Sequence, residues 1–255
     1  MSQNNTVESA APAHAGLLRA GGVAALLVAL LTVIEMTLFI IYPPPDTVSA
    51  WFELFQSSPL LGLISFWGLE IPMYAMFVLV FLALYAVLAR VSRSGMAFAL
   101  TLSLLGTGIF FATNNPFSML TLSRKFAAAA TDLQRSALLS AGEAILAITN
   151  QRAVGGFNIA LFLVSIAGVI VAVIMLRAPS FSRLTSYVGI LAFGFSLADY
   201  LRQAMTSSML FTLFLVIPGA LLLVAWFTLA GLRLLELGHR GASEARPVPA
   251  GGQGS

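Results

Sequence analysis

The sequence predicts an all-α fold: a polytopic membrane helix bundle with six transmembrane helices, plus a pair of amphipathic helices in the long loop between spans three and four. Of the 255 residues, 59% are hydrophobic and only 9% are charged. Soluble proteins average about 45–50% apolar and about 25% charged residues. Apolar runs that approach the roughly 20 residues needed to cross a bilayer recur six times along the chain. The bilayer, rather than water, is therefore the solvent for most of this surface.

The predicted organisation is one transmembrane domain, residues 19–237, flanked by two tails, residues 1–18 and 238–255, that we expect to be disordered. The six spans are expected at about 21–42, 69–89, 96–112, 154–176, 184–201 and 209–232. The first run is longer than the hydrophobic region of a signal peptide, which has about 7–15 residues. We therefore expect an uncleaved span, although Val48-Ser49-Ala50 resembles a cleavage site.

Prolines mark two of the boundaries. Pro43-Pro44-Pro45 ends the first span, because proline cannot continue a helix. The residues that follow, Asp46–Ser58, are predicted to form a short interfacial helix. The next apolar run, Leu60–Ala89, is longer than a hydrocarbon core of about 30 Å requires. Two interpretations stay open: Leu60–Gly68 lies in the interface, or the helix is tilted and kinked near Pro72.

The loop between spans three and four is predicted to be helical. It is too long for a structureless connection, so we expect it to contain elements of its own over residues 116–149. The first helix is expected at Pro116–Ala130. The second begins after Thr131, which forms a Thr-x-x-Gln capping box with Gln134. Its apolar residues recur at helical spacing: Leu133, Ala137, Leu138, Ala141, Ala144, Ile145 and Ile148.

The distribution of basic residues predicts the orientation. Six spans put both termini on one side, and eight of the thirteen basic residues fall on that side. They are Arg19, Arg90, Arg93, Arg177, Arg183, Arg233, Arg240 and Arg246. The other five are Arg124, Lys125, Arg135, Arg152 and Arg202. The positive-inside rule therefore predicts a multi-pass protein of the bacterial cytoplasmic (inner) membrane with both termini in the cytoplasm.

Three acidic side chains interrupt the apolar runs: Glu35, Glu70 and Asp199. A carboxylate at the centre of a membrane helix costs about 2.5–3.5 kcal/mol on insertion scales, so it usually has a partner or a function. Glu35 lies deepest, roughly 12 Å below the outer end of its span by the helical rise per residue. Asp199 and Arg202 are spaced i,i+3 and are therefore expected to pair.

Polar side chains are predicted at every outer helix end, which suggests a hydrated cavity in the outer half of the bundle. We expect Glu35 at its floor and the helical segment 116–149 over its mouth. The candidate ligand or ion-relay residues are Glu35, Glu70, Asn114, Asn115, Asn158, Asp199 and Arg202. The alternative is that these residues form structural pairs and helix caps, or meet water at the interface.

Several chemistries lack the residues that they need. Cysteine is absent, which excludes thiol catalysis and iron–sulfur clusters. The only lysine, Lys125, lies outside the spans, so no retinal Schiff base is expected. The only histidines, His14 and His239, are in the tails and cannot hold an intramembrane haem. We assign no catalytic residue, no metal ligand and no cofactor. Dispersed arginines without a basic helix argue against nucleic acid as a partner.

One stretch resembles a family of uncharacterised bacterial six-span integral membrane proteins, known as a domain of unknown function. The resemblance is carried by Asn114-Asn115-Pro116-Phe117-Ser118-Met119-Leu120, Leu122-Ser123, Asp132, Gln134-Arg135 and Gly142-Glu143. It implies the six-helix fold and a bacterial inner membrane. It implies no activity and no site residues.

Two functions remain open at this point. The first is binding or moving a small molecule or cation through the outward-facing polar cavity. The alternative is a structural or regulatory membrane subunit that docks a partner through its outer helices. A membrane enzyme is disfavoured because no nucleophile–base pair is visible. The lipid bilayer is the expected partner in either case, and the oligomeric state stays open.

Overall fold

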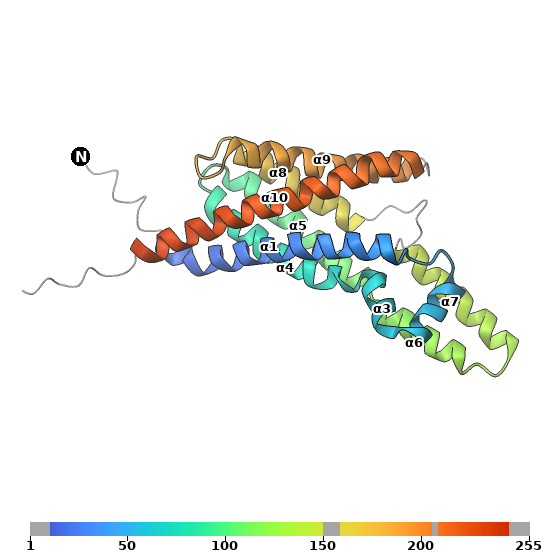
Figure 1. Ribbon diagram of the computed structural model, residues 1–255. Coiled ribbons are helices and arrows are strands. Elements are labelled where there is room, and N and C mark those ends of the chain that lie inside the picture. Colours follow the sequence, from blue (N-terminus) through green and yellow to red (C-terminus); the bar gives the residue numbers. More distant parts are fainter. Residues whose placement is uncertain (1–10, 150–158, 206–208, 245–255) are drawn as a thin grey trace, which may run out of the picture.

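The computed structural model describes residues 11–149, 159–205 and 209–244, and the regular structure within these ranges is entirely helical (Figure 1). The helices are α1 (Ala11–Ile41), α2 (Val48–Ser57), α3 (Pro59–Leu63), the π-helical turn η2 (Ile64–Gly68), α4 (Glu70–Leu88), α5 (Arg93–Thr113), α6 (Pro116–Ala127), α7 (Asp132–Thr149), α8 (Ile159–Met175), α9 (Arg183–Met205) and α10 (Met209–Glu244). The predicted all-α fold class is confirmed.

The six long helices form a closed ring in which each helix packs against two neighbours. The order around the ring is α1, α4, α5, α8, α9 and α10, and α10 packs back against α1. The start of α1 and the end of α10 therefore share one end of the bundle, which we call the terminal end (Figure 1). The small helices α3, α6 and α7 lie at the opposite end, which we call the distal end (Figure 1).

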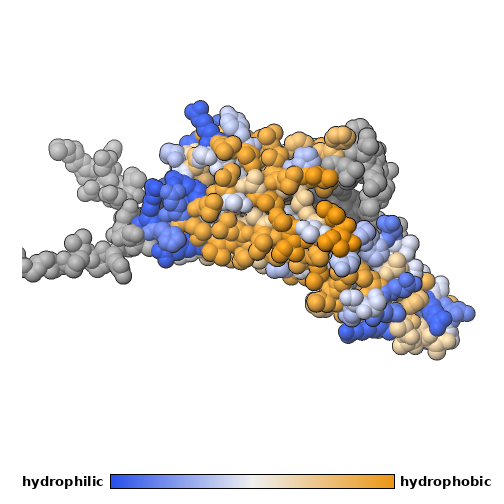
Figure 2. Space-filling view, viewed as in Figure 1, coloured by the Kyte–Doolittle hydropathy of each residue, from blue (hydrophilic) through white to orange (hydrophobic). Residues whose placement is uncertain are grey.

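The bundle has the length and surface of a multi-pass membrane protein. Five helical segments among the described residues are long and apolar enough to cross a bilayer. Helix α8 is apolar over its 17 described residues and lies in the ring between α5 and α9. Hydrophobic side chains cover the middle of the bundle, and hydrophilic ones gather towards its two ends (Figure 2). Such a belt needs lipid around it, because monomeric soluble proteins rarely expose apolar patches this continuous.

Small residues let α1 and α10 approach each other near the terminal end. A Cβ atom added to Gly22 would lie 2.9 Å from the Gly231 carbonyl oxygen and 2.7 Å from Leu235 Cγ. Ala25, one turn along α1, is fully buried in the same contact. Close backbone approach through small residues is the usual basis of helix association in lipid, where apolar burial gives no driving force.

Both tails are more helical than predicted. Helix α1 already begins at Ala11 and α10 continues to Glu244, so parts of the expected disordered tails, 1–18 and 238–255, are ordered helix. Beyond the apolar run of α10, Glu236 pairs with Arg233 and with Arg240 on the same helix face. Such i,i+3 and i,i+4 ion pairs stabilise a helix where it leaves the hydrocarbon.

The distal helices form a separate unit, the helical subdomain, made of α2, α3, η2, α6 and α7. They pack around a second hydrophobic cluster, whose buried members are Val48, Trp51, Phe52, Phe55, Phe66, Met119, Leu120 and Leu146. Ser123 Oγ donates a hydrogen bond of 2.9 Å to the Phe52 carbonyl oxygen, which ties α6 to α2. The predicted capping box is present. The backbone N–H of Gln134 donates to Thr131 Oγ1 over 3.3 Å, and the backbone N–H of Thr131 donates to Gln134 Oε1 over 3.4 Å.

A sharp break separates the helical subdomain from α4. Phe66 (φ −100°, ψ 63°) and Trp67 (φ 60°, ψ 15°) both leave helical geometry, and Trp67 is the one non-glycine residue with positive φ among the described residues. The break therefore falls at Phe66–Trp67 and not near Pro72. Pro72 instead lies in the first turn of α4, where a missing N–H leaves no bond unmade. Leu60–Gly68 belongs to the helical subdomain rather than to a continuous span.

Candidate ligand cavity

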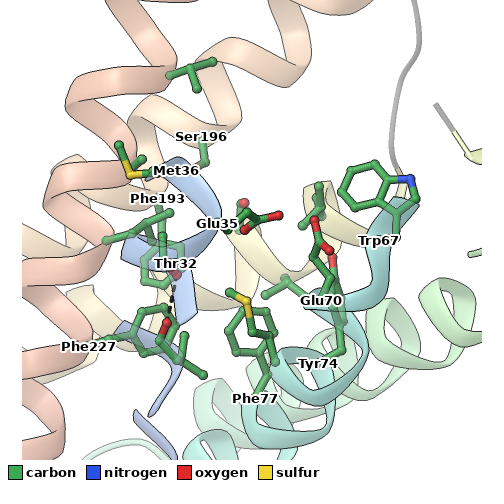
Figure 3. A pocket seen from close by; sticks show the side chains of 18 of the residues that line it. Thr32, Glu35, Met36, Trp67, Glu70, Tyr74, Phe77, Phe193, Ser196 and Phe227 are labelled. Carbon is green, nitrogen blue, oxygen red and sulfur yellow. Dashed lines mark hydrogen bonds between the residues drawn. The ribbon is translucent and has the colours of Figure 1, made fainter. Parts of the chain in front are cut away.

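A cavity of about 280 Å³ lies inside the ring, in its distal half. Its walls come from α1, η2, α4, α8, α9 and α10, so five of the six ring helices contribute. The lining residues used below are Glu35, Trp67, Glu70, Tyr74, Phe77, Ser165, Phe193, Tyr200, Ala220 and Phe227. Figure 3 shows the two glutamates pointing into the same space from α1 and from α4.

Glu70 is the most unusual group in the wall. It is the first residue of α4, three residues after Trp67 at the break, and only 6% of it is exposed. Its Oε2 atom has no hydrogen-bond partner among the described residues. Leaving a buried polar atom unpaired costs about 1–3 kcal/mol, and more for a charged group. The side chain of Glu35 is close enough to interact with that of Glu70.

Tyr74 lies one helical turn after Glu70, so both side chains are on the same face of α4. It is 1% exposed, and its hydroxyl also has no hydrogen-bond partner among the described residues. The ring is held in place by stacking on Phe110 of α5, with centroids 3.8 Å apart and planes 5° from parallel. Two buried polar atoms that point into one cavity are thus both without a partner.

Aromatic rings form much of the remaining wall. Phe77 of α4 stacks on Phe227 of α10, with centroids 5.5 Å apart, and Phe193 of α9 meets Phe227 edge-on at 6.4 Å. The side chains of Tyr200 of α9 and Ser165 of α8 both line the cavity and are close enough to interact. The cavity therefore combines two carboxyl groups and a free tyrosine hydroxyl with a largely apolar and aromatic surface.

The cavity reaches the outer surface of the ring between α1 and α10. Phe39 of α1 and Val216 of α10 both line it, yet they are 36% and 42% exposed. The two helices are in close contact at the terminal end and diverge towards the distal end (Figure 1). Phe39 and Val216 therefore contribute both to the cavity wall and to the surface of the bundle, at the distal ends of α1 and α10.

The described part of the wall holds no positively charged side chain. No lysine, arginine or histidine is among the described residues that line the cavity. Arg202, the basic residue nearest in sequence to the α9 part of the wall, forms an ion pair of 2.9 Å with Asp199. This pair confirms the i,i+3 contact expected from the sequence, and both side chains are about nine-tenths buried. Neither Asp199 nor Arg202 lines the cavity.

The other predicted site residues lie elsewhere. Asn114 is buried at the end of α5, where its Nδ2 donates to the Phe110 carbonyl oxygen over 3.2 Å. Asn115 caps α6 by accepting a hydrogen bond of 3.0 Å from the Phe117 amide. Neither asparagine lines the cavity, and Asn114 Oδ1 has no hydrogen-bond partner among the described residues. Asn158 lies outside the described residues.

The prediction that the segment 116–149 covers the cavity is wrong, since all of this segment is among the described residues. No residue of α6 or α7 lines the cavity, and these helices instead pack on α2 and α3 beside the bundle. The physical reason is that α6 and α7 find their apolar partners in the second hydrophobic cluster. One link to the cavity remains: Trp67 Nε1 donates a hydrogen bond of 3.1 Å to the Thr149 carbonyl oxygen, the last residue of α7.

Comparison with known protein families gives one match. The family described as "Domain of unknown function (DUF4386)" matches residues 41–231. The chain belongs to this family. The membership confirms the resemblance noted in the sequence. The matched DUF4386 region includes Glu70, Tyr74 and most of the wall, whereas Glu35 on α1 precedes it. No curated protein and no solved structure matches the chain.

Sequence reasoning missed the aromatic and hydroxyl part of the site. Tyr74 was within reach, because it follows Glu70 at i,i+4 on a helix and so shares its face. Tyr200 is the direct neighbour of Asp199, but it is the tyrosine and not the aspartate that faces the cavity. Ser165 and Phe227 had no local signal, since apolar spans offer many residues of these types and only the ring arrangement selects among them.

Proposed function

We propose that this membrane protein binds a small molecule in the cavity inside its helix ring. The observation that supports the proposal is the pair of buried atoms without a partner, Glu70 Oε2 and the Tyr74 hydroxyl, on the wall of a cavity of about 280 Å³. Ligand sites are typically apolar concavities with a few convergent polar groups. A ligand that pairs with both atoms removes the free-energy penalty of leaving them unpaired.

The partial exposure of the lining residues Phe39 and Val216 at the surface of the bundle supports a route from the bilayer. A ligand dissolved in the membrane reaches the cavity there without crossing the packed terminal half of the ring. We therefore favour binding of a partly apolar molecule over conduction of a hydrated ion, whose water shell this wall cannot replace.

Filling the cavity tests the proposal. Ala220 lines the cavity, and the neighbouring Leu221 is exposed on the surface of α10 and does not line the cavity. Ala220→Phe is expected to fill the cavity, and Leu221→Phe is the matched control on the outer surface. The probes are four single-ring molecules of similar shape: phenethylamine, trimethyl(phenethyl)ammonium, phenethyl alcohol and 3-phenylpropionate. Binding is measured by titration calorimetry on protein in phosphatidylcholine nanodiscs.

We expect saturable binding of at least one probe to the wild type and to Leu221→Phe, and at least a tenfold weaker binding to Ala220→Phe. If all three proteins give the same heats with every probe, the cavity does not bind small molecules and the proposal fails.

The proposal includes a location, the bacterial cytoplasmic membrane with both ends of the chain in the cytoplasm. Among the described basic residues, seven lie at the terminal end and four towards the distal end. The seven are Arg19, Arg90, Arg93, Arg177, Arg183, Arg233 and Arg240. A carboxy-terminal alkaline phosphatase fusion is expected to be inactive and a fluorescent-protein fusion to be bright. The reverse pattern contradicts the orientation.

A second candidate function is docking of a membrane partner through the helical subdomain. It is favoured by apolar side chains that α6 and α7 leave exposed: Phe117, Leu133 and Ile148. A photo-crosslinker at position 133 tests it in native membranes. A discrete adduct that is lost when Phe117 and Ile148 are changed to serine supports docking, and cross-linking to lipid alone contradicts it.

A further inference from the structure

We propose that the ligand of this cavity is a small amphipathic amine, bound as its protonated form with the nitrogen between Glu35 and Glu70. The proposal rests on the proposed function, since it names the class of ligand for the same cavity. Three observations lead to it: the sign of the charge, the need for a hydrogen-bond donor, and the nature of the wall.

The sign of the charge comes from what surrounds the two carboxyl groups. Glu35 and Glu70 interact with each other, and no basic side chain among the described residues lines the cavity to balance them. Arg202 is the basic residue nearest in sequence to the α9 part of the wall, and its guanidinium is paired with Asp199. An ionised carboxylate in an apolar site needs a paired charge. Because the described residues of the wall supply no such charge, a cationic ligand would supply it.

The hydrogen-bonding need narrows the kind of cation. Glu70 Oε2 is buried without a donor among the described residues, and an ionised carboxylate can only accept hydrogen bonds. A protonated amine brings both a positive charge and N–H donors, and charge-assisted hydrogen bonds are roughly twice as strong as neutral ones. A quaternary ammonium group brings the charge but no N–H, so Oε2 remains unpaired.

The wall favours an organic cation over a metal ion. The described residues contain no group of three or more histidine, cysteine, aspartate or glutamate side chains able to hold a metal. The remaining surface presents aromatic rings, including Trp67, Phe77 and Phe227, to the interior (Figure 3). Aromatic faces attract organic cations and pack on apolar tails. A cavity of about 280 Å³ is near the small end of ligand sites, which suits a single ring or a short chain.

The four probes separate these requirements on the unmodified protein. Phenethylamine has charge and N–H donors, trimethyl(phenethyl)ammonium has charge alone, phenethyl alcohol has a neutral donor, and 3-phenylpropionate has the opposite charge. In neutral phosphatidylcholine nanodiscs, the headgroups do not concentrate the cations. We expect phenethylamine to bind at least tenfold more tightly than the alcohol and the trimethyl compound, and the carboxylate not to bind.

Two variants test which of the two glutamates binds the amine. Glu70→Gln is expected to weaken phenethylamine binding at least tenfold and to leave the alcohol unchanged, and Glu35→Gln is expected to have a smaller effect because Glu35 is only half-buried. Glu53→Gln is the matched control, since Glu53 is exposed on α2 outside the cavity.

The outcomes distinguish the two proposals. If the alcohol binds to wild-type protein as tightly as the amine, and Ala220→Phe abolishes both, the cavity binds ligands but the amine proposal is wrong. Tight binding of 3-phenylpropionate, or amine binding that Glu70→Gln leaves unchanged, also overturns it. Absence of any cavity-dependent binding contradicts the proposed function itself.

Discussion

Trp67 and Thr149 connect the cavity to the helical subdomain. The Trp67 indole lines the cavity, and its Nε1 donates a hydrogen bond of 3.1 Å to the Thr149 carbonyl oxygen at the end of α7. Trp67 also has positive φ at the break before α4. One residue thus forms part of the cavity wall, lies at the break before α4 and makes the contact to α7.

Trp67→Phe is expected to loosen the end of α7 while keeping an aromatic ring in the wall. One hydrogen bond contributes about 0.5–1.5 kcal/mol. The free energy of local opening at the last turn of α7 should fall by that amount, so its amides should exchange faster. Hydrogen exchange with mass spectrometry measures the change. Trp226→Phe is the control, because the Trp226 Nε1 atom is buried without a partner among the described residues. Equal exchange of α7 in both variants contradicts the role of the bond.

Glu70→Met is expected to stabilise the unliganded protein. The change removes a buried carboxyl group with an unpaired oxygen and replaces it with an apolar chain of similar length. The expected gain is about 1–3 kcal/mol, the cost of one unpaired buried polar atom. Thermal unfolding in detergent measures it, and Glu53→Met gives the surface baseline. A variant that melts below the wild type would mean that Glu70 has a structural partner.

The Asp199–Arg202 pair is expected to be structural. Either Asp199→Asn or Arg202→Met removes one charge of this buried pair, and breaking a buried ion pair costs about 3–5 kcal/mol. The double variant Asp199→Leu with Arg202→Met should recover part of that loss, as measured by unfolding temperature. Probe binding should persist in whatever fraction folds, because neither side chain lines the cavity. Loss of binding at unchanged stability would instead assign the pair to the site.

The contact between α1 and α10 is expected to be intolerant of side chains. Gly22→Val pushes a Cβ atom to within 2.9 Å of the Gly231 carbonyl oxygen, and overpacking of this kind costs about 1–3 kcal/mol. Gly108→Ala on α5 is the control, since a Cβ atom there meets nothing within 4 Å. The control should be neutral or slightly stabilising, because glycine inside a helix is unfavourable relative to alanine. Equal stability of the two variants would refute the close packing.

Apolar run length predicted long apolar helices, but it could not find the helix ends. Helix α10 continues past Leu232 because Glu236 joins Arg233 and Arg240, an interaction that a hydropathy average does not register. At the other terminus, Arg19 Nε donates to the Gly238 carbonyl oxygen over 3.3 Å, so the two extensions support each other. The capping box at Thr131 was predictable because it needs only residues that are three apart.

The candidate site was predictable only in part. Glu35 and Glu70 were both singled out as costly in an apolar span, and they do face one cavity. Asn114 and Asn115 raised the same expectation, but Asn114 Nδ2 donates to the Phe110 carbonyl oxygen, Asn115 caps α6, and neither residue lines the cavity. Glu70 also stands at a helix end, as the first residue of α4, and still has an oxygen without a partner among the described residues. Position at a helix end therefore could not separate the residues that line the cavity from those that do not.

The closed ring has a consequence for the order of assembly. Because α10 is the last helix of the chain and its neighbour in the ring is the first, the enclosure is completed only when synthesis ends. Until then Glu35 and Gly22 of α1 lack the α10 neighbour that they have in the complete ring. The cavity therefore does not exist in the nascent chain, and a chain that stops before α10 leaves the ring of helices open on one side.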